Sequence, residues 1–182
     1  MTLALIAVFF LFLIIFGIFV FLADSSFGGL DFSTNRETIK QVVGIIKQRH
    51  LESGNFYDLG SARGNFASQI AGVFPNLRVT GIDNNSLRLL VSKIRTMFLK
   101  NINFQKENIF KTNVSSADVI YIYLPKELMP ELQAKLQKEL KPGSMVITNK
   151  VSFPNWPLVE KLNELLYMQK SKLQIQYQIL IL

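Results

Sequence analysis

The chain has 182 residues, a net charge of +7 and no cysteine, which excludes disulfides, thiolate nucleophiles and cysteine-ligated zinc. Its single histidine, His50, also excludes a histidine-rich metal site, so no metal is predicted. Without an apolar N-terminal segment about 155 residues remain, which suits one domain with a full core rather than two.

The N-terminal stretch at residues 3–23 contains no charged residue and consists mainly of leucine, isoleucine, phenylalanine and valine. At about 1.5 Å per residue it reaches about 31 Å, matching the roughly 30 Å hydrocarbon core of a bilayer. A cleaved signal peptide is the alternative, but the start lacks a basic residue and Leu22-Ala23-Asp24 is a poor cleavage site. The sequence therefore predicts a transmembrane anchor at residues 1–23, with the bilayer as a partner.

Basic residues appear only beyond this stretch, beginning at Arg36 and Lys40. Because lysine-rich and arginine-rich flanks stay on the cytoplasmic side, we expect a single-pass membrane protein whose C-terminal domain faces the cytoplasm. A linker at residues 24–33 joins the anchor to this domain, which we place at residues 34–182. A basic domain held there is also attracted to anionic lipid.

The C-terminal domain is predicted to begin with a helix that runs to about Gln48. Thr34 and Glu37 have the spacing of a capping box, in which the threonine hydroxyl accepts a hydrogen bond from the backbone N–H of Glu37. The apolar side chains that this helix is expected to bury are Ile39, Val42, Val43 and Ile46.

Residues 56–66 then carry an apolar run that stops at Asp58 and gives way to a turn containing Gly60 and Gly64. Glycine at the first position permits a backbone angle that a side chain forbids, and Gly64 lets the next helix begin tight against the strand. Asp58 would sit at the carboxyl end of a strand, where open α/β sheets bind their ligands. The pattern predicts a cofactor site; an ordinary strand-to-helix turn is the alternative.

Spacing separates the two cofactor classes that use such a turn. A dinucleotide fingerprint requires glycine at three positions, two of which hold Ala62 and Asn65 here. The acid Asp58 followed by Gly60, Ala62 and Gly64 resembles motif I of the class I S-adenosylmethionine-dependent methyltransferases, with alanine replacing one glycine. That cofactor has no diphosphate for a helix N-terminus to bind, but it offers an ammonium to an acid and a carboxylate to backbone N–H groups.

A second strand is predicted at residues 77–83, and it ends in another acid, Asp83. In a right-handed βαβ unit Asp58 and Asp83 emerge side by side at the same edge of the sheet. The second carboxylate can accept hydrogen bonds from both ribose hydroxyls, and Asn84 beside it can touch the adenine.

The adenine has further candidate contacts after a third strand at residues 102–105. Asn108 can read the adenine amino group while Ile109 packs on the face of the ring. A turn asparagine is the alternative for Asn108.

A helix is predicted between the second and third strands, at residues 86–100. Its apolar residues Leu87, Leu90, Ile94 and Phe98 are expected to face inward, and its basic residues Arg88, Lys93, Arg95 and Lys100 outward. Because no exposed aromatic side chains are interleaved with these basic residues, they indicate a solvated face and nucleic acid is not predicted as a partner.

The remaining elements complete an α/β, Rossmann-like, seven-stranded class I methyltransferase sheet with an N-terminal transmembrane helix. They are strands at residues 117–124 and 144–148, a helix at residues 126–140, a short helix, and a hairpin of strands at residues 165–169 and 173–182. The fourth strand carries Tyr121 and Tyr123, either of which can orient an amine, but no catalytic residue is assigned.

The whole chain resembles a narrower family, the membrane-anchored lysine N-methyltransferases related to the ATP synthase c-subunit lysine methyltransferase. The resemblance rests on the anchor and on Asp31-Phe32-Ser33-Thr34, Asp58-Leu59-Gly60-Ser61, Asn108-Ile109-Phe110-Lys111, residues 132–143 and Phe153-Pro154-Asn155-Trp156. Family members tend to have glycine at the position of Ala62, an acid at that of Asn108, and a proline-containing run at residues 32–34.

This resemblance implies S-adenosyl-L-methionine as the cofactor and a lysine of a membrane protein as the methyl acceptor. The cofactor-binding residues that it and the strand-end pattern imply are Asp58, Gly60, Ser61, Gly64, Asp83, Asn84, Asn108 and Ile109. A small-molecule or lipid methyltransferase, or an inactive methyltransferase-like scaffold, are the alternatives.

Overall fold

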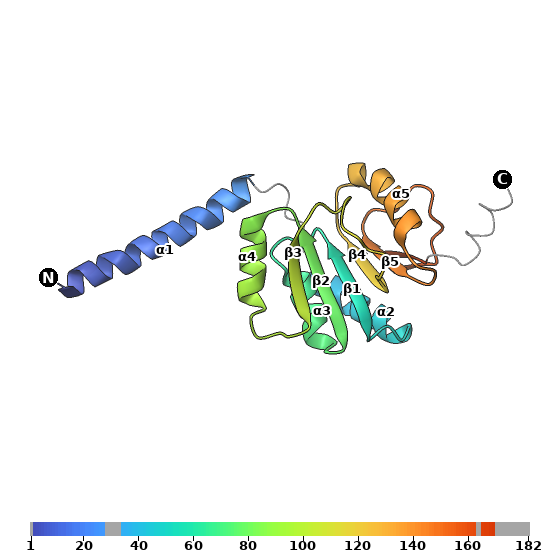
Figure 1. The fold of residues 1–182 in the computed structure, drawn as a ribbon, viewed down its shortest axis with the longest axis horizontal. Coiled ribbons are helices and arrows are strands. Elements are labelled where there is room, and N and C mark those ends of the chain that lie inside the picture. The colour runs from blue at the N-terminus through green and yellow to red at the C-terminus, as the bar shows by residue number, and fades with distance from the viewer. Residues whose placement is uncertain (1, 28–33, 163–164, 170–182) are drawn as a thin grey trace. The chain divides into compact units, whose positions relative to one another are not determined.

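A computed structural model describes residues 2–27, 34–162 and 165–169 of the chain (Figure 1). The chain divides into two compact units, residues 1–31 and residues 32–182.

The first unit contains helix α1 (Thr2–Phe27), whose side chains are described at residues 4–19. A membrane span requires about 20 consecutive, predominantly apolar residues. Within the described part of the chain, no helix combines the length and the apolar character needed to cross a membrane. This finding contradicts the predicted single-pass localisation with a domain facing the cytoplasm, and the predicted transmembrane helix is not borne out.

The second unit is built on a sheet with the strand order β3-β2-β1-β4-β5-β7-β6. Its parallel strands are β1 (Gly54–Leu59), β2 (Leu77–Asp83), β3 (Ile102–Lys106), β4 (Val119–Ile122) and β5 (Met145–Asn149). All residues of β4 and β5 are buried, as in parallel strands covered on both faces. The predicted α/β fold with a parallel sheet is confirmed.

The antiparallel end of the sheet differs from the prediction. Strand β7 (Leu165–Gln169) pairs antiparallel with β5, at the position predicted for the sixth strand. Its partner β6 (Glu160–Leu162) stands where a short helix was expected, because three residues are too few to show a period of two. The strand predicted at residues 173–182 lies outside the described residues.

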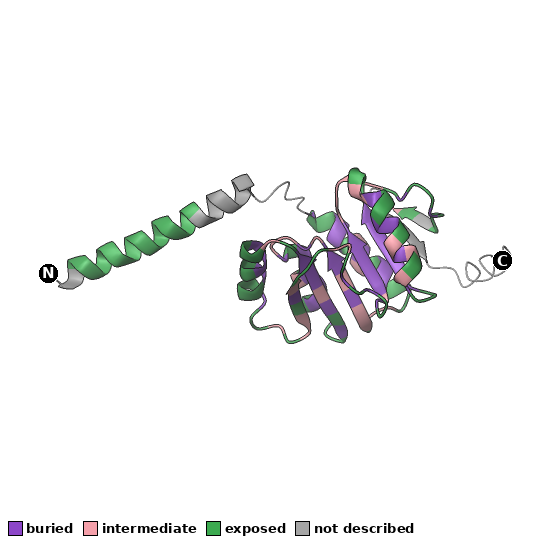
Figure 2. Cartoon of the chain, turned by 45° about the horizontal axis from the view of Figure 1, so that its top comes forward, coloured by how far each residue is buried: buried purple, intermediate pink, exposed green. Residues whose placement is uncertain are grey.

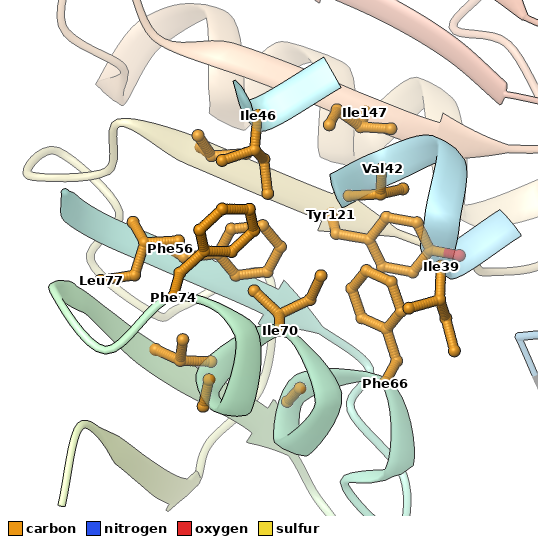
Figure 3. Close-up of a cluster of buried hydrophobic side chains, with 14 of the residues drawn as sticks. Ile39, Val42, Ile46, Phe56, Phe66, Ile70, Phe74, Leu77, Tyr121 and Ile147 are labelled. Atoms are coloured by element: carbon orange, nitrogen blue, oxygen red, sulfur yellow. The ribbon is translucent and has the colours of Figure 1, made fainter. Parts of the chain in front are cut away.

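Helices cover both faces of this sheet. One face packs against α2 (Arg36–Gln48), α3 (Asn65–Val73) and α4 (Ser86–Arg95), and its apolar cluster is drawn in Figure 3. The other face packs against α5 (Met129–Glu139), which follows the short helix η1 (Lys126–Leu128) and buries Leu132 and Leu136.

Helix α2 begins one residue later than a capping box at Thr34 requires. Asn35 is the N-cap, and its Oδ1 accepts a hydrogen bond of 2.7 Å from the backbone N–H of Thr38. Neighbouring threonine and asparagine are both good N-caps, so the sequence alone did not separate them. The predicted burial is confirmed for Ile39, Val42 and Ile46, whereas Val43 is half-buried.

Helix α4 faces the opposite way from the prediction. The four apolar residues expected to face inward are exposed: Leu87 by 44%, Leu90 by 55%, Ile94 by 62% and Phe98 by 88%. The helix instead buries Arg88, Leu89 and Ser92, and Thr96 directly after it is buried as well. The reason is the polar bonding that this inner face makes with the turn after β1, described below.

Candidate functional site

The site lies where the order of the sheet reverses, between β1 and β4. Open α/β sheets bind their ligands at this point, outside the carboxyl ends of the strands. Asp58 pairs in register with Tyr121 on β4 and with Gly81 on β2. The acid one residue before the end of β1 therefore stands at the reversal point of the sheet.

The turn after β1 is tied to the end of β2 by backbone hydrogen bonds. The N–H groups of Gly60 and Ser61 both donate to the carbonyl of Ile82, each at 2.9 Å, and that of Gly64 donates to Ser61 at 2.8 Å. These N–H groups, on which a cofactor carboxylate was expected to bind, are therefore already used within the protein.

Three residues of this turn adopt left-handed backbone conformations: Gly60 with φ 85°, Ala62 with φ 47° and Gly64 with φ 68°. A Cβ on Gly64 would also lie 2.6 Å from Cζ of Phe104, so both the backbone angle and the packing require glycine there. Ala62 adopts the same region with a side chain, at a cost of about 1–2 kcal/mol.

Asp83 holds the turn from the other side. Its Oδ2 accepts from the N–H of Ala62 and its Oδ1 from the N–H of Asn85, each at 2.9 Å. Asp83 is 6% exposed and raises the pKa of Asp58 through its charge, so the structure brings the two acids together. Each carboxylate oxygen of Asp83 keeps a second lone pair for another donor.

Asp58 has the most perturbed acidity in this region. Burial and then the nearby charge of Asp83 raise its pKa from 3.8 to about 8, and its side chain is nearly inaccessible at 4% exposure. A carboxyl group in this position is protonated at neutral pH and would ionise if a cation were placed beside it.

Two buried oxygen atoms in this region have no hydrogen-bond partner, Oγ of Ser61 and Oδ1 of Asn149. Asn149 is 3% exposed and is the last residue of β5, at the same carboxyl-end edge of the sheet. Buried polar atoms are nearly always paired, so these two are candidates to meet a ligand.

Tyr121 is packed rather than presented to a substrate. Its ring stacks on Phe66 with a centroid distance of 3.8 Å (Figure 3), and its hydroxyl bonds to Thr34 Oγ1 at 3.0 Å. The Nδ2 of Asn149 donates to the same hydroxyl at 3.2 Å. Burial raises the pKa of Tyr121, so it stays protonated. Tyr123 is half-buried, with Nζ of Lys150 5.7 Å from its ring centroid.

The remaining predicted contacts lie in the loops that follow β2 and β3. Asn84 is exposed directly after β2. Asn108 is exposed as well, and its Oδ1 accepts from the N–H of Phe110 at 2.9 Å, so it serves the turn itself. Ile109 is half-buried. The N–H of Glu107 donates to the carbonyl of Asp83 at 3.1 Å, which draws this loop toward the site.

Sequence reasoning missed the polar residues that support the site from behind. Ser92 is fully buried on α4, and its Oγ lies within donating distance of two carbonyls, that of Ala62 at 3.1 Å and that of Arg88 at 2.9 Å. Thr34 and Asn149 likewise support the site, because both form hydrogen bonds with the hydroxyl of Tyr121. A signal existed for Ser92, because it lies four residues after Arg88 and four before Thr96 on one polar helix face.

Comparison with known proteins identifies the class and then the family. An RNA methyltransferase from Salinibacter ruber, solved with S-adenosyl-L-homocysteine, covers 78% of this chain and 95% of its own, with a TM-score of 0.71 and 17% identity. The second unit thus has the Rossmann-like fold of the class I methyltransferases. The family model of the ANTKMT methyltransferase domain matches residues 58–160, and the chain belongs to this family.

Curated relatives are similar to about two thirds of the chain. The ATP synthase c-subunit lysine N-methyltransferase of Xenopus laevis is 27% identical over 122 residues, 65% of this chain and 53% of that protein. A protein-lysine N-methyltransferase of Saccharolobus islandicus is 28% identical over 126 residues, 68% of this chain and 77% of that protein. The chain thus spans about half the length of the frog relative. Among the described residues, no group of three or more potential metal-ligating side chains occurs.

Proposed function

We propose that the chain is an S-adenosyl-L-methionine-dependent protein-lysine N-methyltransferase, with its methyltransferase domain at residues 34–182. The observation that carries the proposal is Asp58, a buried carboxyl group at the sheet reversal whose pKa is raised to about 8. Two neighbouring acids at the end of the sheet make such a site favourable for a positively charged ligand.

The residues present fit this cofactor. In the proposal Asp58 accepts from the ammonium of its amino-acid end, and Asp83 accepts from the ribose hydroxyls with the lone pairs left by Ala62 and Asn85. The backbone N–H groups of the turn are already bonded within the protein. The unpartnered Oγ of Ser61 can instead donate a hydrogen bond to the carboxylate of the cofactor. Asn84, Ile109 and Asn108 would border the adenine, with Asn108 contributing through the turn that its side chain closes.

When bound, the cofactor would supply a methyl group on a sulfonium: a neutral amine nitrogen would bond to the methyl carbon as the carbon–sulfur bond breaks, leaving that electron pair on sulfur, and the methylated ammonium would then release a proton to water. The protein has to align the amine and exclude water. The carboxyl ends of β4 and β5 are buried, which lowers the local dielectric and favours the neutral form of a lysine amine. The buried hydroxyl of Tyr121 stays protonated, so the proposal assigns it a packing role and not that of a base.

Lysine as the acceptor is supported by the names of the relatives, which are protein-lysine N-methyltransferases. The test incubates the full chain and methyl-labelled cofactor with a mixed protein and lipid extract. We expect label in acid-precipitated protein, recovered as methyl-lysine after hydrolysis. Label in the organic extract instead would favour a lipid or small-molecule acceptor.

The matched control is Asp58→Asn, because asparagine is close in shape to the protonated carboxyl group. This variant should fold normally and lose transfer. Transfer by the variant at the wild-type rate would contradict the role of Asp58, and absence of cofactor binding by the wild type would favour the inactive scaffold.

A further inference from the structure

Helix α4 and the turn after it present an apolar ridge to solvent, which we call the α4 ridge. It consists of Leu87, Leu90, Val91, Ile94, Met97 and Phe98, and α4 is coloured largely as exposed in Figure 2. The two residues in the turn are the most exposed, Met97 by 68% and Phe98 by 88%. A continuous exposed apolar stripe of this kind marks an interaction surface rather than scattered surface residues.

The α4 ridge cannot turn inward without dismantling the site. The opposite face of the helix holds Ser92, whose hydroxyl donates to Ala62 and whose Cβ would lie 2.9 Å from a Cβ on Gly64. Asn85 caps the helix with Oδ1 accepting from Leu87 and Arg88 at 2.9 and 3.2 Å. The orientation of α4 is therefore set by the cofactor-side turn, and its apolar face is not covered by the described residues of the second unit.

The residues around the α4 ridge are positively charged, which indicates the kind of partner that it contacts. Residues 84–100 contain Arg88, Lys93, Arg95 and Lys100 and no acidic residue. Lys93, Arg95 and Lys100 are exposed beside the apolar side chains. Basic residues flanking an exposed apolar stripe are the composition of helices that lie in the interface of anionic bilayers.

We infer that the α4 ridge docks on the surface of an anionic lipid bilayer, with its apolar side chains entering the headgroup region and its basic residues contacting lipid phosphates and carboxylates. Met97 and Phe98 are mostly exposed, which suits a fluid apolar phase that needs no complementary shape. Nucleic acid would use the basic residues but not the apolar ones. This is contact at the lipid surface and involves no helix crossing the bilayer.

The chain has no cysteine, so a single introduced cysteine gives a clean probe. Full-length Phe98→Cys is labelled with an environment-sensitive fluorophore and mixed with vesicles of phosphatidylcholine alone or with phosphatidylserine. We expect a blue-shifted, stronger emission only with phosphatidylserine. The label reports its own position, whichever other part of the chain touches the vesicle.

The control label is placed by Val73→Cys on α3, a position that is also apolar and exposed, by 47%. It should not respond to either vesicle. Reversing two charges with Lys93→Glu and Arg95→Glu should weaken the response at position 98 at least about tenfold, since each basic residue near an anionic surface contributes about fivefold.

Three outcomes would overturn the inference. The label at position 98 could stay unchanged with phosphatidylserine vesicles, or respond equally to neutral vesicles. It could also respond to an acidic amphipathic peptide or to an oligonucleotide and not to vesicles, which would assign the ridge to protein or nucleic acid. Circular dichroism of each variant establishes that the fold is retained.

Discussion

Helices α2 and α4 are both amphipathic and cover the same face of the sheet, yet they face opposite ways. Helix α2 buries its apolar residues, with Ile46 fully inaccessible, whereas α4 exposes Ile94 by 62%. The inner face of α4 places Leu89 in the apolar core but also buries Arg88 and Ser92, and Ser92 lies within hydrogen-bond distance of the turn after β1. Hydrophobic periodicity therefore indicates a helix, but the bonding needs of a neighbouring site decide which face it buries.

Truncating the same residue type on the two helices tests this contrast most strongly. Ile46→Ala removes a fully buried side chain and should lower the free energy of unfolding by about 2–5 kcal/mol. Ile94→Ala should change it by less than about 0.5 kcal/mol, because that side chain is mostly in water. Urea denaturation of both variants measures the difference, and equal losses would contradict the orientation of α4.

Adding a methyl group to a glycine gives the next largest contrast. Gly64→Ala would place Cβ 2.6 Å from Phe104 and 2.9 Å from Ser92, at φ 68°. Left-handed strain of about 1–2 kcal/mol and overpacking of about 1–3 kcal/mol should together destabilise the fold. Gly44→Ala on α2 meets nothing within 4 Å and should stabilise by about 0.5–1 kcal/mol. Thermal unfolding checks that the two changes have opposite signs.

Removing the hydroxyl that ties α4 to the turn has a smaller effect. Ser92→Ala leaves the carbonyl of Ala62 without this donor and should cost about 0.5–1.5 kcal/mol. The affinity for the cofactor should fall together with stability, because the turn after β1 loses its hydrogen bond to α4. Ser86→Ala, at an exposed position of the same helix, is the control and should leave both stability and affinity unchanged. An unchanged affinity in Ser92→Ala would show that the turn holds its shape alone.

Much of the sheet was predictable because its signals are local. Strand β2 has the predicted bounds, residues 77–83, since an apolar run ends at an acid there. Asp58 stands at the carboxyl end of β1 for the same reason. Glycines and acids at strand ends are read over a few residues, without knowledge of distant contacts.

The features that the sequence did not reveal depend on distant partners. The roles of Thr34 and Asn149 arise from bonds to Tyr121, 87 and 28 residues away. The raised pKa of Asp58 requires its burial and the position of Asp83. The orientation of α4 likewise follows from contacts with a turn about 30 residues earlier in the chain, as in the bond between Ser92 and Ala62.

The smallest expected effect concerns Ala62, which adopts a left-handed backbone conformation between two glycines of the turn. Ala62→Gly relieves left-handed strain of about 1–2 kcal/mol but adds about 0.5–1 kcal/mol of glycine entropy, for a net gain of about 0.5–1 kcal/mol. Differential scanning calorimetry should show a slightly higher unfolding temperature. A lower one would indicate that the Ala62 methyl group packs favourably in the turn.

The central claim is that the buried carboxyl group of Asp58 receives the cationic end of the cofactor. Because its pKa is raised, the contribution of this group to the free energy of unfolding is full below about pH 4 and is lost as the pH rises to about 8, where the folded state would have to bury the charge. The affinity for a ligand that carries an ammonium should instead rise with pH, because the ammonium binds the ionised carboxylate.

Calorimetric titration with S-adenosyl-L-homocysteine from acidic pH up to pH 8 tests this claim most directly. For the wild type we expect affinity to rise by up to about tenfold per pH unit until the pKa of Asp58 near 8 is reached. Asp58→Asn should bind weakly and without this pH dependence. Wild-type affinity that does not change with pH, or equal affinity in the variant, would contradict the account.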